Sequence, residues 1–248
     1  DGYVSIFAWF SIIGISLGVA AIIIVMSVMN GFRIDLTNRI IGLNSHLNIY
    51  SFDNEITNKQ ADELILNIDN SFFYQHYKSI ETNGLIIKSN NSKGVMIKGY
   101  DAYDKNHYLF NSINMGALIQ NPKSEILIGD SLANEMNLSV GDKVKIAIPK
   151  TDKTILGNIP RFKTLEVVGV FDLGLYEYDS NLIFLSSELV RKLLLYDEDI
   201  YNKIEFFTSS PNEIELFKNK VELETSNLLL NFYSISWKDQ NKTLINAL

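Results

Sequence analysis

Few residues in this chain have types that could do chemistry, and the three histidines come first. His46, His76 and His107 stand 30 and 31 positions apart, and none belongs to an HxxxH or HExxH pattern. Metal sites commonly draw two of their ligands from one short segment of chain. The spacing therefore predicts core or surface imidazoles and no metal site.

The second candidate is a pair of carboxylates beside aromatic rings, Glu177 and Asp179 in the run Tyr176-Glu177-Tyr178-Asp179. Apolar surroundings raise the pKa of a carboxyl group and can suit it to acid–base work. No partner group stands nearby in the sequence, so we favour a structural loop here.

The chain also lacks the patterns of nucleotide binding and nucleophilic catalysis. It has no GxxxxGKS or GxxxxGKT loop, no GxSxG elbow and no cysteine, so it holds no phosphate cradle, hydrolase serine or thiol of these kinds. We expect a chain that is not an enzyme, with no catalytic residue and no cofactor of its own.

Composition excludes several other classes. The 248 residues are 46% hydrophobic, and 22 basic against 29 acidic residues give a formal net charge of −7. This apolar share excludes a disordered chain, and the absence of cysteine excludes a disulfide-stapled miniprotein. Nucleic-acid binding needs a concentrated basic face, which the mixed charges do not provide.

The first structural element predicted along the chain is a long apolar segment. The 26 residues from Val4 to Met29 carry no charge and would reach about 39 Å as a helix, against about 30 Å of membrane hydrocarbon. A signal peptide has a shorter apolar region, so we predict a transmembrane helix. Gly14 and Gly18 lie on one face with Ser11 and Ala21, which favours packing against other helices, although small residues are frequent in any such helix.

The helical pattern continues past this run. Apolar and charged residues separate onto two faces, and residues 42–44 supply a stop signal. The apolar residues are Phe32, Leu36, Ile40 and Leu43, and the charged ones are Arg33, Asp35 and Arg39. The spacing predicts an amphipathic stalk.

From about residue 46 to 236, short strands alternate with amphipathic helices, which predicts an α+β fold with two lobes. We expect helices at Thr57–Ile68, from Asp130 or Ser131, at Ser187–Leu195, and after a Ser210 cap with Pro211 at the first position. The expected strands are 47–50, 84–88, 94–99, 125–128, 143–148, 164–171, 182–185, 203–207 and 232–235, with 84–88 and 94–99 forming a hairpin through a turn at 90–93.

The connection from Pro149 to Lys163 is unusual. It places about 15 residues between two strands that read as an antiparallel pair, whereas most hairpin loops have about two to five. It contains Ile155, Leu156 and Ile159, and exposed apolar groups of this kind favour a covering partner. We predict a docking element, with an internally packed loop as the alternative.

Three segments carry a resemblance to a known family. Residues 10–50, FSIIGISLGVAAIIIVMSVMNGFRIDLTNRIIGLNSHLNIY, resemble the first membrane helix and stalk of the lipoprotein-releasing ABC transporter permeases, the LolC and LolE family. Residues 140–186, VGDKVKIAIPKTDKTILGNIPRFKTLEVVGVFDLGLYEYDSNLIFLS, are similar to its periplasmic domain. Trp237, Asn241, Leu244, Ala247 and Leu248 resemble the approach to its second membrane helix.

The resemblance implies a permease with four membrane helices in the bacterial inner membrane and a large MacB-like periplasmic domain with porter and sabre lobes. Two such subunits, identical or paralogous, would pair on a separate ABC ATPase of the LolD type, which would bind the ATP and Mg²⁺. The complex would extract triacylated lipoproteins from membrane lipid and pass them to the periplasmic carrier LolA.

The resemblance also implies site residues. The family docks its carrier through a hook, an extended hairpin with a T-P-x-G-x-x-P pattern, beside a basic pad. Thr154, Leu156, Gly157, Ile159 and Pro160 fit the hook, Ile155 stands where the pattern has its first Pro, and Arg161 and Lys163 fit the pad. The lipoprotein cavity of the family is lined by its first helix and stalk, which falls on Met26, Met29, Phe32, Leu36 and Ile40.

The expected division is residues 1–45 for the first membrane helix and stalk, 46–236 for the periplasmic domain, and 237–248 for the start of a second membrane helix. Within 46–236, the porter-like lobe would take about 46–100 and 200–236, and the sabre-like lobe about 101–199 with the hook at 149–163. Because the chain opens on Asp1, we expect a piece of a longer permease.

Two alternatives stay open at this point. One is a MacB-like exporter permease that transmits motion to a periplasmic pump, which gives no reason for a long hook. The other is a single-pass anchored binding or sensor protein, which would need no further membrane helices after the domain.

Overall fold

The computed structural model describes residues 2–43, 45–68, 72–103, 107–154 and 157–243. Side chains are described within these ranges except at 2–6, 36, 38–40, 42–43 and 149–160. The chain divides into two compact units, residues 1–44 with 242–248, and residues 45–241.

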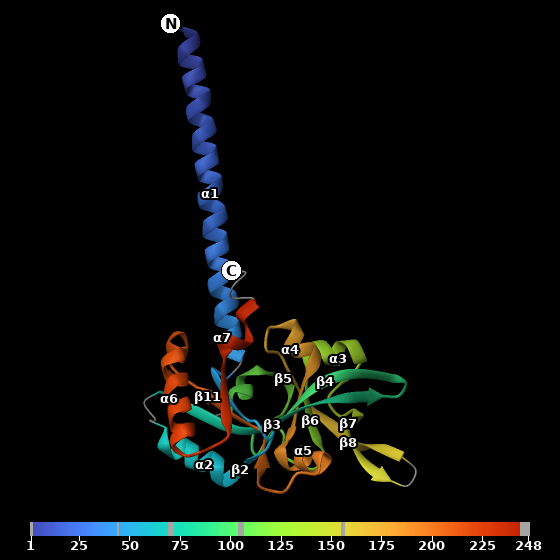
Figure 1. Cartoon of the computed structure of the whole chain (residues 1–248). Helices are drawn as coiled ribbons and strands as arrows, with labels where there is room; N and C mark the ends of the chain where they lie inside the picture. Colours follow the sequence, from blue (N-terminus) through green and yellow to red (C-terminus); the bar gives the residue numbers. More distant parts are fainter. Residues whose placement is uncertain (1, 44, 69–71, 104–106, 155–156, 244–248) are drawn as a thin grey trace. The chain divides into compact units, whose positions relative to one another are not determined.

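The first unit is a long helix, α1 (Gly2–Leu43), which Figure 1 shows as one uninterrupted coil. Its segment from Phe7 to Asp35 is long and apolar enough to cross a membrane, judged by length and composition. The large apolar side chains described along this segment are exposed, with Leu17 at 72%. The predicted membrane helix therefore stands as a candidate span.

The second unit starts and ends in a β-α-β-β-α-β arrangement. Its elements are β1 (Leu47–Ser51), α2 (Asn58–Asn67), the first half of β3 (Gln75–Lys88), β11 (Lys203–Phe207), α6 (Ile214–Asn227) and β12 (Phe232–Ser236). These strands are antiparallel in the order β12-β1-β11-β3, as in ferredoxin-like folds. Phe217 of α6 packs on Phe206 of β11, with ring centroids 5.8 Å apart, so helix α6 covers one face of the strands (Figure 1).

A ring of six strands consists of β3 and five strands that lie between β3 and β11 in the chain. It adds β4 (Asn91–Tyr100), β6 (Glu125–Gly129), β7 (Lys143–Thr154), β8 (Gly157–Phe171) and β9 (Leu182–Ser186) to β3. Pairing runs from β3 through β4, β9, β6, β8 and β7 and returns to β3. Within the ring itself, closure of this kind gives each strand a partner at both edges. Its core is aliphatic, including Ile86, Ile97, Ile126, Ile146 and Ile183.

The remaining elements surround this ring or connect it to the first strands. They are β2 (Ile56–Thr57), η1 (Tyr108–Ser112), β5 (Ile113–Gly116), α3 (Asp130–Met136), α4 (Tyr176–Asn181), α5 (Ser187–Leu194), β10 (Ile200–Tyr201), η2 (Pro211–Glu213) and α7 (Trp237–Gln240). β5 pairs with β8, and β10 pairs with β2.

Most expected elements are confirmed, and local sequence explains where they begin. Helix α2 begins after Thr57, whose hydroxyl accepts from the backbone N–H of Gln60 at 3.2 Å, while the Gln60 side chain accepts from the backbone N–H of Thr57 at 2.9 Å. Such a reciprocal cap satisfies two N–H groups that the first turn leaves without helical partners. Helix α5 uses Ser186 in the same position, accepting from the N–H of Leu189.

Outside the 149–163 connection, three expectations about local structure are wrong. The hairpin of β3 and β4 is paired from Ser79–Tyr100 to Lys88–Asn91, so its turn is at residues 89–90 and not at 90–93. Residues 176–179 belong to helix α4 instead of a loop. Ser210 makes no side-chain cap, because a 3₁₀ turn from Pro211 to Glu213 precedes α6.

Candidate functional site

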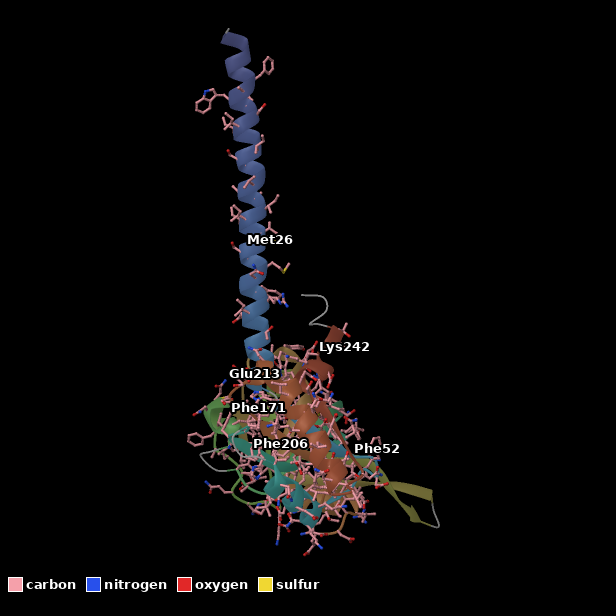
Figure 2. All side chains as sticks on the ribbon, turned by 60° about the vertical axis from the view of Figure 1, so that its left-hand side comes forward. Met26, Phe52, Phe171, Phe206, Glu213 and Lys242 are labelled. Atoms are coloured by element: carbon pink, nitrogen blue, oxygen red, sulfur yellow. The ribbon has the colours of Figure 1, made fainter. Side chains whose placement is uncertain are left out.

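The connection predicted between residues 149 and 163 is an extended hairpin. β7 and β8 stay paired from Lys143–Glu166 out to Thr154–Gly157, with a register shift between Ile148 and Thr151. The expectation of a loop of about 15 residues is therefore wrong, and the strands continue to the tip. Figure 2 shows this hairpin reaching beyond the rest of the second unit, and Figure 1 shows it in yellow, below the green hairpin of β3 and β4 in that view.

The hook residues fall at the end of this hairpin. Thr154 is paired with Gly157, Ile159 with Asp152, and Pro160 with Thr151. Ile155 and Leu156 lie outside the described residues. Proline cannot donate to a strand ladder, but each strand of a two-stranded hairpin has one open edge, so the backbone tolerates Pro160 here.

The root of the hairpin carries the two residues expected in the basic pad. Arg161 and Lys163 lie two apart on β8 and therefore share one face of the strand. The Arg161 guanidinium donates from Nη1 to the carbonyl of Lys192 at 3.0 Å, which ties β8 to α5. Lys163 is exposed.

The opposite face of the root presents an apolar residue that the sequence interpretation missed. Phe162 is 50% exposed, and the Lys145 ammonium lies 5.6 Å from the centre of its ring. Ala147 stands between Phe162 on one side and Leu85 of β3 on the other, and Leu85 is also exposed. The sequence could have indicated the exposure of Phe162. Side chains alternate along a strand, so Phe162 must lie on the face opposite its neighbours Arg161 and Lys163.

The residues expected to line a lipoprotein cavity lie along α1. The side chains of Met26, Met29 and Phe32 are at least half exposed, at 61%, 50% and 56%. Steps of three, three, four and four place them within about 120° of the helix surface together with Leu36 and Ile40, whose side chains lie outside the description. The helix geometry thus brings the five positions onto one face.

Gly14 and Gly18 leave a notch in α1. A Cβ atom built at either position meets nothing within 4 Å in the described structure. The Ser11 hydroxyl on the same face donates to the carbonyl of Phe7 at 2.9 Å, so its polar group is satisfied within the helix. This face can approach another helix closely.

The carboxylates considered for acid–base chemistry, Glu177 and Asp179, do not form an acid–base pair. Asp179 is buried, and its Oδ1 accepts from the backbone N–H of Leu173 at 2.8 Å. Burial raises the pKa of Asp179 to about 6, with the neighbouring Asp172 adding to the effect. Glu177 is exposed on α4. Asp179 therefore anchors the turn that precedes α4.

The histidines do not come together. His46 accepts at Nδ1 from the backbone N–H of Thr208 at 2.8 Å, and buried His107 packs among tyrosines, 4.7 Å from the Tyr100 ring. Desolvation lowers the pKa of His76 on β3. Over the described ranges, three or more His, Asp or Glu side chains nowhere gather closely enough to hold a metal ion.

A buried ion network where β3, β4 and β11 meet was also missed from the sequence. Lys98 and Lys203 lie 3.3 and 3.0 Å from Oε1 of Glu205, and Lys203 lies 2.9 Å from Glu81. The Tyr100 hydroxyl donates to the other Glu205 oxygen at 2.5 Å. Burial opposes ionisation of Glu205, but the two ammonium groups hold its pKa well below the usual value.

Known proteins share the fold of this chain. A family model described as MacB-like periplasmic core domain matches residues 8–222, and the chain belongs to this family. Two solved structures share the fold at a TM-score of 0.51. The periplasmic region of MacB from Actinobacillus actinomycetemcomitans is 14% identical, covering 83% of this chain and 95% of that one. The extracellular domain of the ABC-type transporter YknZ from Gram-positive bacteria is 13% identical, covering 78% and 100%.

More specific relatives are the lipoprotein-releasing system transmembrane proteins. LolC of Neisseria meningitidis is 28% identical over 205 residues, 81% of this chain and 49% of that protein. LolC of Buchnera aphidicola is 26% identical over 243 residues, 96% and 58%, and LolE of Haemophilus influenzae is 26% identical over 215 residues, 84% and 51%. The resemblance to the LolC and LolE family is confirmed. The chain spans about half the length of these relatives.

Proposed function

We propose that this chain is the membrane-anchored part of a permease subunit that extracts lipoproteins from the bacterial inner membrane and hands them to the periplasmic carrier LolA. The observation that carries the proposal is the paired hairpin of β7 and β8, which extends from a MacB-like domain to Thr154 and Gly157. A projecting hairpin of this length is useful for holding a second protein during transfer of a lipoprotein. A protein that is only anchored to the membrane would have no need of it.

The two faces of the hairpin root support a contact with a second protein. One face offers the cations Arg161 and Lys163, and the other offers Phe162 with Lys145 beside it. On the face of Phe162, an exposed aromatic ring beside the ammonium of Lys145 suits a partner that offers an apolar patch next to acidic groups. The hairpin would keep the receiving carrier close to the release point and raise its effective concentration.

The energetics of transfer explain why such proximity matters. Each buried CH₂ group contributes about 0.8 kcal/mol, so three acyl chains of about 16 carbons hold on the order of 40 kcal/mol in the bilayer. The chains must therefore pass from lipid to one apolar cavity and then to another. We assign the lining of the first cavity, within the permease, to Met26, Met29, Phe32, Leu36 and Ile40 of α1. Methionine suits such a cavity because it adapts to variable apolar shapes.

We further propose that the subunit works in a complex with other subunits. The subunit would pair with a second permease subunit, identical or paralogous, and ATP with Mg²⁺ would bind to a separate LolD-like ATPase. The β-α-β-β-α-β part would be the porter-like lobe and the six-strand ring the sabre-like lobe. Residues beyond Phe32 would form the stalk, and residues 237–248 would lead to a second membrane helix.

Removal of the hairpin end tests the proposal. Lys153–Pro160 is replaced by Asn-Gly in the assembled transporter, and capture of LolA by the purified complex is measured. We expect capture to fall at least about tenfold, because the docking contact is lost while the ring stays closed. The matched control replaces the turn at Ser89 and Asn90, at the end of the β3–β4 hairpin, with the same Asn-Gly.

Unchanged capture after removal of Lys153–Pro160 would contradict the carrier function. It would favour the alternative of a MacB-like exporter permease, whose fold this chain shares. An equal loss in the Ser89–Asn90 variant would show that a general disturbance of the ring, and not the hairpin, controls capture.

A further inference from the structure

The hairpin of β7 and β8 leaves the six-strand ring at one defined place. Ile148 of β7 is buried and pairs with Arg161 of β8, and this is the last regular pair before the register shift between Ile148 and Thr151. Beyond the shift the strands pair again, and we call residues 151–154 and 157–160 the outer hairpin. An irregularity of this kind bends a strand pair. The ladder alone therefore does not fix the direction of the outer hairpin.

Helix α5 provides a fixed reference beside this place. Its residues Leu189, Val190, Leu193 and Leu194 are buried and belong to the aliphatic core of the ring. Because a packed core resists displacement, α5 keeps its position relative to the ring strands.

The C-terminal end of α5 leaves one carbonyl group without a helical partner. Leu195 adopts a left-handed conformation, with a φ of 58°. The backbone N–H of Tyr196 then donates to the carbonyl of Arg191 at 3.0 Å and not to the carbonyl of Lys192, its regular helical acceptor. In the part of the chain that the structure describes, no backbone N–H donates to the Lys192 carbonyl.

Arg161 supplies the missing donor. Its guanidinium donates from Nη1 to the carbonyl of Lys192 at 3.0 Å, and a cation at this end of a helix also interacts favourably with the helix dipole. The two basic side chains in the last turn of α5 are engaged elsewhere. Arg191 lies 3.2 Å from Asp101, and Lys192 lies 2.5 Å from Glu188. Arg161 therefore caps α5 from a different element.

Lys163 offers a comparison within the same strand. It lies on the same face of β8 as Arg161, carries the same charge and is exposed. It is paired with Ile146, deeper in the ring than the register shift. The two residues thus share charge and face, but only Arg161 stands at the bend.

We propose that Arg161 is a positioning residue, which holds the outer hairpin in one direction by capping α5. The cap fastens β8 to the core of the ring at the last pair before the bend, so the outer hairpin moves less about the register shift. A steadier hairpin increases the share of encounters with LolA in which the docking contacts form. The step concerning LolA rests on the proposed carrier function, whereas the effect on the hairpin does not.

The motion of the outer hairpin tests the cap. The chain has no cysteine, so Asn158→Cys gives one labelling site on the outer hairpin. The full chain in lipid nanodiscs is labelled there with a fluorescent dye, and time-resolved anisotropy measures the amplitude of nanosecond motion. Arg161→Ala should raise this amplitude at least about twofold. Lys163→Ala removes the same charge and should leave it unchanged, and melting curves check that both variants are folded.

Capture of LolA tests the consequence for docking. The assembled transporter is measured at about 1 M salt, where charges are screened over about 3 Å. Lys163→Ala should then capture LolA as well as wild type does. Arg161→Ala should still capture at least about fivefold less, because salt does not restore the direction of the hairpin.

Three results would overturn the proposal. Equal motion in wild type and Arg161→Ala, or an equal increase in both variants, would show that the cap on α5 does not hold the hairpin. Greater motion in Arg161→Ala with capture at high salt equal to that of Lys163→Ala would show that hairpin direction does not control docking. A wild-type transporter that captures no LolA would contradict the carrier function, and the anisotropy would still decide whether Arg161 holds the hairpin.

Discussion

Lys98 of β4 and Glu205 of β11 bring their charged groups to 3.3 Å, although 107 residues separate them in the chain. Both side chains are buried, at 7% and 1% exposure. The pair joins the six-strand ring to the β-α-β-β-α-β part through β3, which lies between their strands. Because Glu81 and Lys203 complete the network, two negative and two positive groups balance in the interior.

Glu205→Gln should lower the free energy of unfolding by about 3–5 kcal/mol at neutral pH, because it leaves buried ammonium groups with too few anions. Glu166→Gln on β8 is the matched control, since Glu166 is exposed and should change stability by less than about 0.5 kcal/mol. Chemical denaturation of both variants measures the difference. A loss in Glu205→Gln no larger than in Glu166→Gln would contradict the role of the network.

The same residue predicts a pH dependence. The ammonium groups lower the pKa of Glu205 in the folded chain below its ordinary 4.5, so the unfolded chain binds more protons as the pH falls through that range. The stability due to Glu205 is therefore present in full above its ordinary pKa and is lost gradually as the pH falls from there toward the much lower pKa of the folded chain. The gap between wild type and Glu205→Gln should narrow as the pH is lowered from 7 to 3.

The network also shows what the sequence could and could not predict. Strands such as β11 and helices such as α5 follow from local alternation and caps, so their expected ranges are nearly those observed. Lys98 and Glu205 belong to residue types that usually face solvent. Their burial depends on pairing between distant strands, which no local pattern records.

The hairpin of β7 and β8 was misjudged for a different reason. Pro149, Gly157 and Pro160 are residues that normally interrupt strands, and they led to the expectation of a loop. An isolated two-stranded extension leaves one edge of each strand open, so these residues cost little there. The exposed position of Phe162 was not predicted, because the prediction for this segment rested on the basic residues Arg161 and Lys163, which lie on the other face of the strand.

Gly129 should be among the least replaceable glycines of the second unit. A Cβ atom at this position would lie 2.1 Å from the carbonyl oxygen of Asp179, a backbone atom that cannot turn aside. We expect Gly129→Ala to lower the melting temperature and to cost more than about 2 kcal/mol. Gly94→Ala on β4 is the control, since a Cβ there meets nothing within 4 Å, and it should be neutral or slightly stabilising.

Phe162→Asp should weaken carrier capture by about tenfold or more while leaving the fold intact, because it removes an aromatic contact that is half exposed. Phe52→Asp, at another exposed aromatic residue of the second unit, controls for added negative charge. Capture assays on purified transporter complexes, with melting curves alongside, measure both effects. Equal capture by wild type and Phe162→Asp would remove this face of the hairpin root from the docking surface.

Met29→Asp should block lipoprotein release and leave assembly of the transporter intact. Met29 shares one face of α1 with Met26 and Phe32 and is half exposed, so a carboxylate there would face the acyl chains and cost about 2.5–3.5 kcal/mol. Ser27→Asp adds the same charge two residues away, about 200° around the helix, and tests whether any charge at this depth is harmful. Release from proteoliposomes and co-purification of the subunits are the two measurements. Normal release in Met29→Asp, or equal loss in both variants, would show that this face of α1 does not line the lipid path.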